Sequence, residues 1–118
     1  MQTQLQNLEQ GVLLVRVQGS LDTAAADRFF KDVSQGIEPG VRHIIVDCQG
    51  IDLVASMGLA AMMRLHARMA QEGGSVKLAG LEGMVAQVVE LMNLDRVVQV
   101  CATVAQAQQA IQNQESSH

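Results

Sequence analysis

The chain has 118 residues, 48% of them hydrophobic, and a formal net charge of -4. This length and hydrophobic content predict one globular domain with its own core, and they exclude a disordered chain. The 8 Lys and Arg residues form no cluster and the 2 Phe residues form no stacking platform, which argues against direct binding of nucleic acid.

Two cysteines, Cys48 and Cys101, end β-like stretches, and neither belongs to a C-x-x-C pair. We expect small buried hydrophobic side chains in a reduced cytosol, and the sequence leaves a disulfide open. The N-terminal stretch lacks the basic and then apolar pattern of a signal peptide. No apolar run approaches the roughly 20 residues that span a bilayer. A soluble, cytoplasmic protein without a membrane span is therefore expected.

The first half of the chain predicts two adjoining strands, a helix and a third strand. Residues 2–8 are polar with a weak alternation of polar and apolar side chains, and residues 12–17 are strongly apolar. A short turn that ends at Gly11 separates the two stretches. This pattern is typical of an antiparallel hairpin. Asp22 or Thr23 is expected to cap a helix over 24–34. The branched residues of 43–48 predict a strand that is buried on both faces.

The second half of the chain alternates helices and strands. We expect a long helix over 57–71, a strand over 76–79, a helix over 82–92, a strand over 97–101 and a closing helix over 104–112. Helical spacing also predicts which side chains face the sheet. In the long helix they are Leu59, Met62, Met63, His66 and Met69 or Ala70, and in the next helix they are Met84, Val88 and Leu91.

This order of elements predicts an α/β fold. We expect a single domain over residues 1–112, with a mixed β-sheet, an N-terminal hairpin and about four helices, and a frayed tail over 113–118. Strands that are joined through helices should be parallel. The loops after the strands at 12–17 and 43–48 can then be neighbours, so that Asp22 and Ser56 share one surface.

Catalytic and metal-binding patterns are poorly represented. The sequence has no G-x-S-x-G elbow, no Walker loop and no G-x-G-x-x-G motif. No two histidines have metal-ligand spacing, and His66 fits a partly buried, hydrogen-bonded side chain better than a general base. We therefore expect no enzyme activity, no metal and no cofactor. A small hydrolytic enzyme remains an alternative that rests only on Asp22 near Ser56, a pair that lacks a base.

Ser56 stands where an apolar stretch meets the long helix, at or next to its N-cap. The backbone N–H groups of Met57, Gly58 and Leu59 are expected to be free to receive an anion, and Gly58 to let a partner or a phosphate approach closely. A phosphate on Ser56 would add nearly two negative charges without unfolding such a helix. A plain Ser N-cap, worth about 1 kcal/mol, is the alternative.

Three segments in fixed order resemble a known family. They read GSLDTAAADRF, HIIVDCQGIDLVASMGLAAMMRLHARMAQEGGSVKLAG and VVELMNLDRVVQV. Together they resemble the STAS domain, which is typified by bacterial anti-sigma factor antagonists, and the likeness extends over about residues 5–111. Ser56 matches the phosphorylated serine of the antagonists, with Gly58 and Leu59 in the same motif. Asp22 matches the aspartate of the family's Gly-x-Leu-Asp motif. The chain departs from the family pattern at Ala55 and Met57.

The resemblance implies a protein that switches partners. Unphosphorylated antagonist binds an anti-sigma factor serine kinase and frees the sigma factor, the kinase phosphorylates the serine, and a PP2C-type phosphatase reverses this. The implied phosphorylation site is Ser56. The implied partner-binding residues are Ser20, Leu21, Asp22, Thr23, Ala55, Met57, Gly58 and Leu59. The alternative is a non-phosphorylated STAS scaffold, or a subunit of a transporter or lipid-trafficking system. A monomer or a weak dimer is expected.

Overall fold

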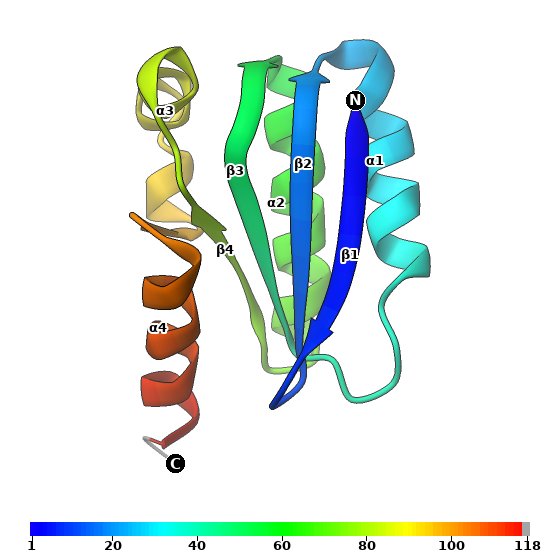
Figure 1. Cartoon of the computed structure of the whole chain (residues 1–118), viewed down its shortest axis with the longest axis vertical. Helices are drawn as coiled ribbons and strands as arrows, with labels where there is room; N and C mark the ends of the chain where they lie inside the picture. Colours follow the sequence, from blue (N-terminus) through cyan, green and yellow to red (C-terminus); the bar gives the residue numbers. More distant parts are fainter. Residues whose placement is uncertain (117–118) are drawn as a thin grey trace.

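The computed structural model describes residues 1–116 and is built on one five-stranded sheet (Figure 1). The strands are β1 (Gln2–Leu8), β2 (Val12–Leu21), β3 (His43–Val54), β4 (Ser75–Ala79) and β5 (Gln99–Cys101). The helices are α1 (Thr23–Gln35), α2 (Ser56–Gln71), α3 (Gly83–Leu91) and α4 (Val104–Ser116), with a short 3-10 helix η1 (Leu94–Arg96). The strands lie in chain order, with β1 antiparallel to β2 and all other neighbours parallel. The predicted α/β fold with an N-terminal hairpin is confirmed.

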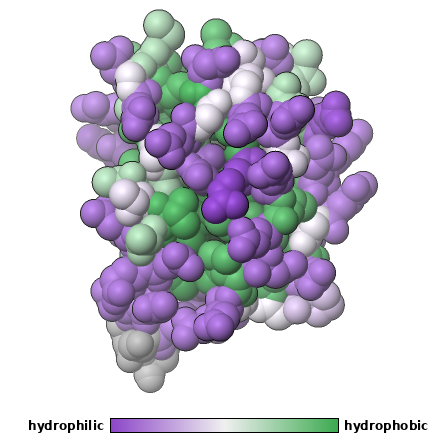
Figure 2. All heavy atoms as spheres, viewed as in Figure 1, coloured by the Kyte–Doolittle hydropathy of each residue, from purple (hydrophilic) through white to green (hydrophobic). Residues whose placement is uncertain are grey.

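Hydrophobic cores lie on both faces of the sheet. Helices α1 and α2 lie behind the sheet in Figure 1, and they bury Phe29 and Leu65 in the larger core. Helix α4 buries Ala107 and Ile111 against Ile45 in the smaller core on the other face. No helix lies over the front of β1 and β2 in this view, and Figure 2 shows mostly hydrophilic side chains on this side of the molecule. The sheet is therefore covered fully on one face and partly on the other.

Strands β2 and β3 are longer than the sequence predicts. Instead of ending at Val17 and Cys48, they run to Leu21 and Val54 and pair with each other almost to their ends. Their second halves contain Gly and polar residues and include two register shifts, so no run of apolar residues indicated a strand there. The extra length carries the segments that follow β2 and β3 to one end of the sheet.

The buried faces of two helices differ in part from the prediction. In α2, Leu65 is buried in the core and Met63 is exposed. In α3 the buried residues are Val85 and Val89, so the predicted inward positions of Met84 and Leu91 are wrong. The sequence of α3, GMVAQVVEL, has apolar residues at two helical phases, and spacing alone could not choose between them. The consequence is that α3 presents large apolar side chains to solvent.

Both cysteines are free and buried, which settles the open question of a disulfide. Cys48 belongs to the larger core and Cys101 to the smaller one, on opposite faces of the sheet. Burial raises the pKa of the Cys48 thiol to about 12, with a further contribution from the neighbouring Asp47 carboxylate. A thiol of this kind is protonated and unreactive at neutral pH. The prediction that both cysteines are buried is confirmed.

His66 links helix α2 to strand β4 and is not placed as a general base. Its Nδ1 atom accepts a hydrogen bond from the backbone N–H of Val76 at 3.1 Å. Burial lowers the pKa of His66, and the charge of Lys77 lowers it further. The side chain is therefore neutral in the folded protein at neutral pH, with Nδ1 as the acceptor. Protonation of Nδ1 would break this bond.

Acidification is expected to lower the free energy of unfolding more in the wild type than in a His66→Asn variant. In the unfolded chain the His66 side chain has its ordinary pKa of about 6.5. Below that pH, His66 therefore binds more protons in the unfolded chain than in the folded one. The contribution of neutral His66 is thus present above about pH 6.5 and is lost as the pH falls through the lowered folded pKa. The Asn side-chain oxygen can accept the Val76 bond without titrating. Urea unfolding at about pH 7.5 and about pH 5.5 measures how much free energy of unfolding the wild type and the variant each lose on acidification. Equal losses in the two proteins would contradict this role.

Helix α4 continues to Ser116, past the expected end at 112. Its last turn is held by Glu115, which accepts a hydrogen bond from His43 at 2.6 Å and from Arg42 at 3.3 Å. Residues 113–116 are therefore helical rather than frayed, while the rest of the expected tail, Ser117 and His118, lies outside the described residues. No helix within residues 1–116 combines the length and the apolar character needed to cross a membrane.

Candidate partner-binding surface

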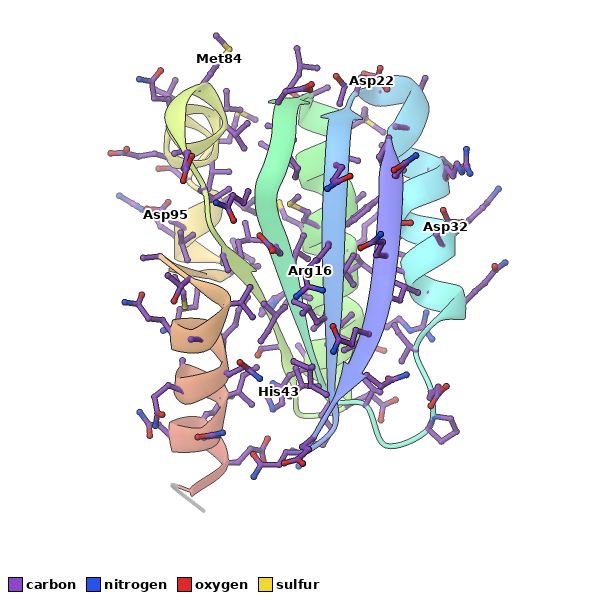
Figure 3. The ribbon with its side chains drawn as sticks, viewed as in Figure 1. Arg16, Asp22, Asp32, His43, Met84 and Asp95 are labelled. Carbon is purple, nitrogen blue, oxygen red and sulfur yellow. The ribbon has the colours of Figure 1, made fainter. Side chains whose placement is uncertain are left out.

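One end of the sheet collects the segments that the sequence singled out. Because β2, β3 and β4 are parallel, their carboxyl ends and the first turns of α1, α2 and α3 lie at the same edge (Figure 1, top). Asp22 and Met84 both lie at this edge, and Met84 projects away from the sheet (Figure 3). Edges of this kind are where α/β proteins usually carry their functional residues.

The segments that follow β2 and β3 are tied directly to each other. Leu21 pairs with Val54 at the ends of the two strands, and the backbone N–H of Ala55 donates to the carbonyl oxygen of Leu21 at 3.0 Å. Asp22 follows Leu21 by one residue, and Ser56 follows Val54 by two. The prediction that these two residues lie on one surface is confirmed.

Asp22 is held in place as the N-cap of α1. Its backbone is extended, and its Oδ1 atom accepts a hydrogen bond from the backbone N–H of Ala25 at 2.9 Å. Of the two predicted caps, Asp22 is therefore the correct one, and Thr23 is the first helical residue. One carboxylate oxygen is used for the cap, and the exposed side chain can still present negative charge to a partner.

A second carboxylate, Asp52, lies beside Asp22 and was not identified from the sequence. Its Oδ1 atom accepts a hydrogen bond from the Ser20 hydroxyl at 2.8 Å. Asp22, Asp52 and Arg28 line one surface hollow, together with Ser20. Asp52 lies in a stretch of β3 that was not predicted to be a strand, so nothing in the sequence placed it opposite Ser20. The hollow brings together two carboxylates, a hydroxyl and a guanidinium, and its hydroxyl is bonded to one of the carboxylates.

Ser56 is the first residue of α2, and its side chain is exposed. The N-cap of this helix is Ala55, which has no side chain that can cap it. Among residues 1–116, no hydrogen-bond partner is found for the Ser56 hydroxyl. The plain N-cap interpretation is therefore wrong, and the hydroxyl performs no structural role that a phosphate would disrupt.

Two of the three N–H groups expected to be free for an anion are already used. The amides of Gly58 and Leu59 donate to the carbonyl oxygen of Ala55 at 2.9 and 3.1 Å. The amides of Ser56 and Met57 are the first two of the helix and have no acceptor within it. Fewer amides are therefore free than predicted, and those without an acceptor in the helix belong to Ser56 and Met57.

Gly58 is buried, and what approaches it closely is the chain's own β2. A Cβ atom at position 58 would lie 2.7 Å from the carbonyl oxygen of Leu21 and 2.8 Å from its Cγ atom. The expectation that Gly58 leaves room for a partner or a phosphate is therefore wrong, because Leu21 occupies that room.

The predicted partner-binding residues divide into a surface set and a supporting set. Leu21, Gly58 and Leu59 are buried and support the surface from beneath. The others are exposed or partly exposed: Ser20, Asp22, Thr23, Ala55 and Met57. Within the described part of the chain, no group of three or more His, Cys, Asp or Glu side chains is arranged to hold a metal ion.

Comparison with protein families agrees with this geometry. A model of the STAS domain matches residues 6–107. The chain belongs to the STAS domain family. The family resemblance noted in the sequence is thus confirmed, and the match includes β2, β3, α2 and the surface around Ser56.

Several relatives of this STAS domain carry functional names. BtrV of Bordetella bronchiseptica, provisionally named an anti-sigma factor antagonist, is 25% identical over 81 residues, which are 69% of this chain and 70% of BtrV. A Thermotoga maritima protein with the same provisional name superposes with a TM-score of 0.85 at 21% identity, over 93% of this chain and 94% of that one. Unphosphorylated SpoIIAA of Bacillus, an anti-sigma factor antagonist, gives a TM-score of 0.80 at 19% identity, over 95% of this chain and 97% of SpoIIAA.

The solved structures establish the fold alone at these identities. A sulfate transporter family protein from Wolinella succinogenes also shares it, with a TM-score of 0.75 at 16% identity, over 91% of this chain and 89% of that one. The choice between an antagonist and a transporter-associated domain therefore depends on the surface around Ser56.

Proposed function

We propose that this STAS domain is an anti-sigma factor antagonist that is controlled by phosphorylation of Ser56. In its unmodified form it binds an anti-sigma serine kinase and so releases a sigma factor for transcription. The observation that carries the proposal is the exposed Ser56 hydroxyl at the first turn of α2, which has no capping role. The names of BtrV and SpoIIAA support the same role.

Phosphorylation would act at the surface without disturbing the fold. The kinase transfers the γ-phosphoryl group of ATP to Ser56 Oγ, which loses its proton, and ADP leaves. The new charge of nearly -2 lies at a helix N-terminus, where negative charge is favourable. A partner seated over Ser56 would instead meet added bulk and negative charge beside Asp22 and Asp52. A PP2C-type phosphatase restores the hydroxyl by hydrolysis and releases inorganic phosphate.

The domain itself acts as a binding protein and has no catalytic role in this cycle. The Ser56 hydroxyl has no hydrogen-bond partner within the described residues that could act as its base. The hydroxyl that does donate to a carboxylate, that of Ser20 to Asp52, belongs to another residue and is not the group that is modified. The cycle takes place in the cytoplasm, because it requires ATP, a kinase and a sigma factor. No direct contact with nucleic acid is needed.

Incubation with ATP and the anti-sigma serine kinases of the source genome, each purified, tests this function. Intact mass measurement is expected to find one added phosphate on the wild type and none on Ser56→Ala, which should fold normally because the Ser56 hydroxyl makes no hydrogen bond within the described residues. A phosphate that persists in Ser56→Ala would disprove the site. A wild type that binds a partner stably and is never modified would favour the scaffold or transporter alternative.

A further inference from the structure

Three large apolar side chains are exposed at the same edge as Ser56. Met57 follows Ser56 in α2 and is 54% exposed, Leu53 near the end of β3 is 47% exposed, and Met84 in the first turn of α3 is 69% exposed. Figure 3 shows Met84 projecting away from the sheet. Exposed apolar residues that gather on one surface indicate an interaction site more strongly than the same residues scattered singly.

Negatively charged side chains are exposed at the same edge as these apolar side chains. Asp22, Asp52 and Glu82 are all exposed and come from the N-cap of α1, the end of β3 and the N-cap of α3. Arg28 is the cationic residue that lines the hollow with Asp22 and Asp52, and its Nε atom lies 3.6 Å from Asp32. The edge therefore carries exposed apolar side chains together with three carboxylates, Asp22, Asp52 and Glu82, which we call the acidic rim.

We infer that Met57, Leu53 and Met84 form the contact by which this domain selects its kinase, and that the kinase offers an apolar recess with a basic rim. The inference rests on the proposed function and adds the chemistry of the partner surface. The first turn of α2 consists of residues 56–59. Ser56 and Met57 are exposed, whereas Gly58 and Leu59 are buried. Met57 is therefore the side chain of that turn that a partner can enclose.

The same arrangement explains how one phosphate would release the partner. Ser56 adjoins Met57, so a recess that encloses Met57 would also enclose the phosphate. Removing so strong a charge from water without a matched cation is costly. Methionine also adapts its shape to a partner, because it is unbranched and has three rotatable bonds.

Calorimetric titration of purified anti-sigma serine kinases with polar variants tests this inference. Met57→Gln and Met84→Gln are each expected to weaken binding about tenfold, as for side chains near the centre of an interface. Leu91→Gln is the matched control, because Leu91 is 78% exposed and lies about 10 Å further along α3. Its affinity should equal that of the wild type. Higher salt should weaken wild-type binding, as expected for an acidic rim.

The possible results separate this inference from the proposed function. If the wild type binds and is phosphorylated while Met57→Gln and Met84→Gln bind equally well, the apolar contact is overturned and the antagonist function stands. If Leu91→Gln loses as much affinity as the other two, the selection is not made at this edge and the inference also fails. A wild type that neither binds nor is modified by any of these kinases overturns the proposed function and this inference together.

Discussion

Ser56→Glu is expected to weaken kinase binding about 100-fold while leaving the melting temperature within a few degrees of the wild-type value. The wild-type hydroxyl makes no hydrogen bond that glutamate would remove within the described residues. A carboxylate in the first turn of a helix is favourable by about 0.3–1 kcal/mol, so the fold should tolerate it. Ser56 adjoins Met57, which the proposed recess of the partner encloses, so a carboxylate at this position would lose water without a matched cation, which should cost several kcal/mol of binding free energy.

Ser56→Gln separates the effect of charge from that of size. Its side chain has almost the same volume as glutamate and no charge, so it should lose far less affinity than Ser56→Glu. Calorimetric titration measures the affinities, and circular dichroism melting checks the fold of each variant. If the two variants lose equal affinity, release depends on bulk, and the electrostatic account is wrong. If Ser56→Glu unfolds the domain, Ser56 has a structural role that the contacts of α2 do not reveal.

Much of the fold follows from local patterns in the sequence. The branched run at 43–48 and the helical spacing after Ser56 gave the correct order of strands and helices. The cap of α1 was predictable to within one residue, because Asp22, one of the two candidates, accepts the backbone N–H of Ala25. Such signals depend only on residues that are close together in the sequence, so they can be recognised without the structure.

The features that long-range packing decides were not predictable. The second halves of β2 and β3 become strands only because they pair with each other, and their Gly and polar residues conceal this. The burial of α3 depends on which of its two apolar faces reaches β3, so Met84 was placed inside and is in fact exposed. Asp52 belongs to the candidate site because β3 continues alongside Ser20, a pairing that the sequence does not reveal.

Gly58→Ala is expected to lower the free energy of unfolding by about 1–3 kcal/mol, as overpacking of a tight core contact does. The new Cβ atom would lie 2.7 Å from the carbonyl oxygen of Leu21, a backbone atom that cannot move aside without shifting β2. The higher helix propensity of alanine offsets about 1 kcal/mol of the loss. The clash should exceed this gain, because Leu21 is fully buried and its carbonyl also accepts the Ala55 amide.

Ser56→Ala is the matched control for Gly58→Ala, because it changes the same helical turn without adding an atom beside Leu21. Urea unfolding should find Ser56→Ala within about 0.5 kcal/mol of the wild type. The Gly58 variant should also bind the kinase more weakly, since a shift of Leu21 displaces both Asp22 and Ser56 from their common edge. If Gly58→Ala is as stable as the wild type, α2 can move away from β2 at little cost. The spacing between Asp22 and Ser56 would then be set by the partner on binding rather than by Gly58.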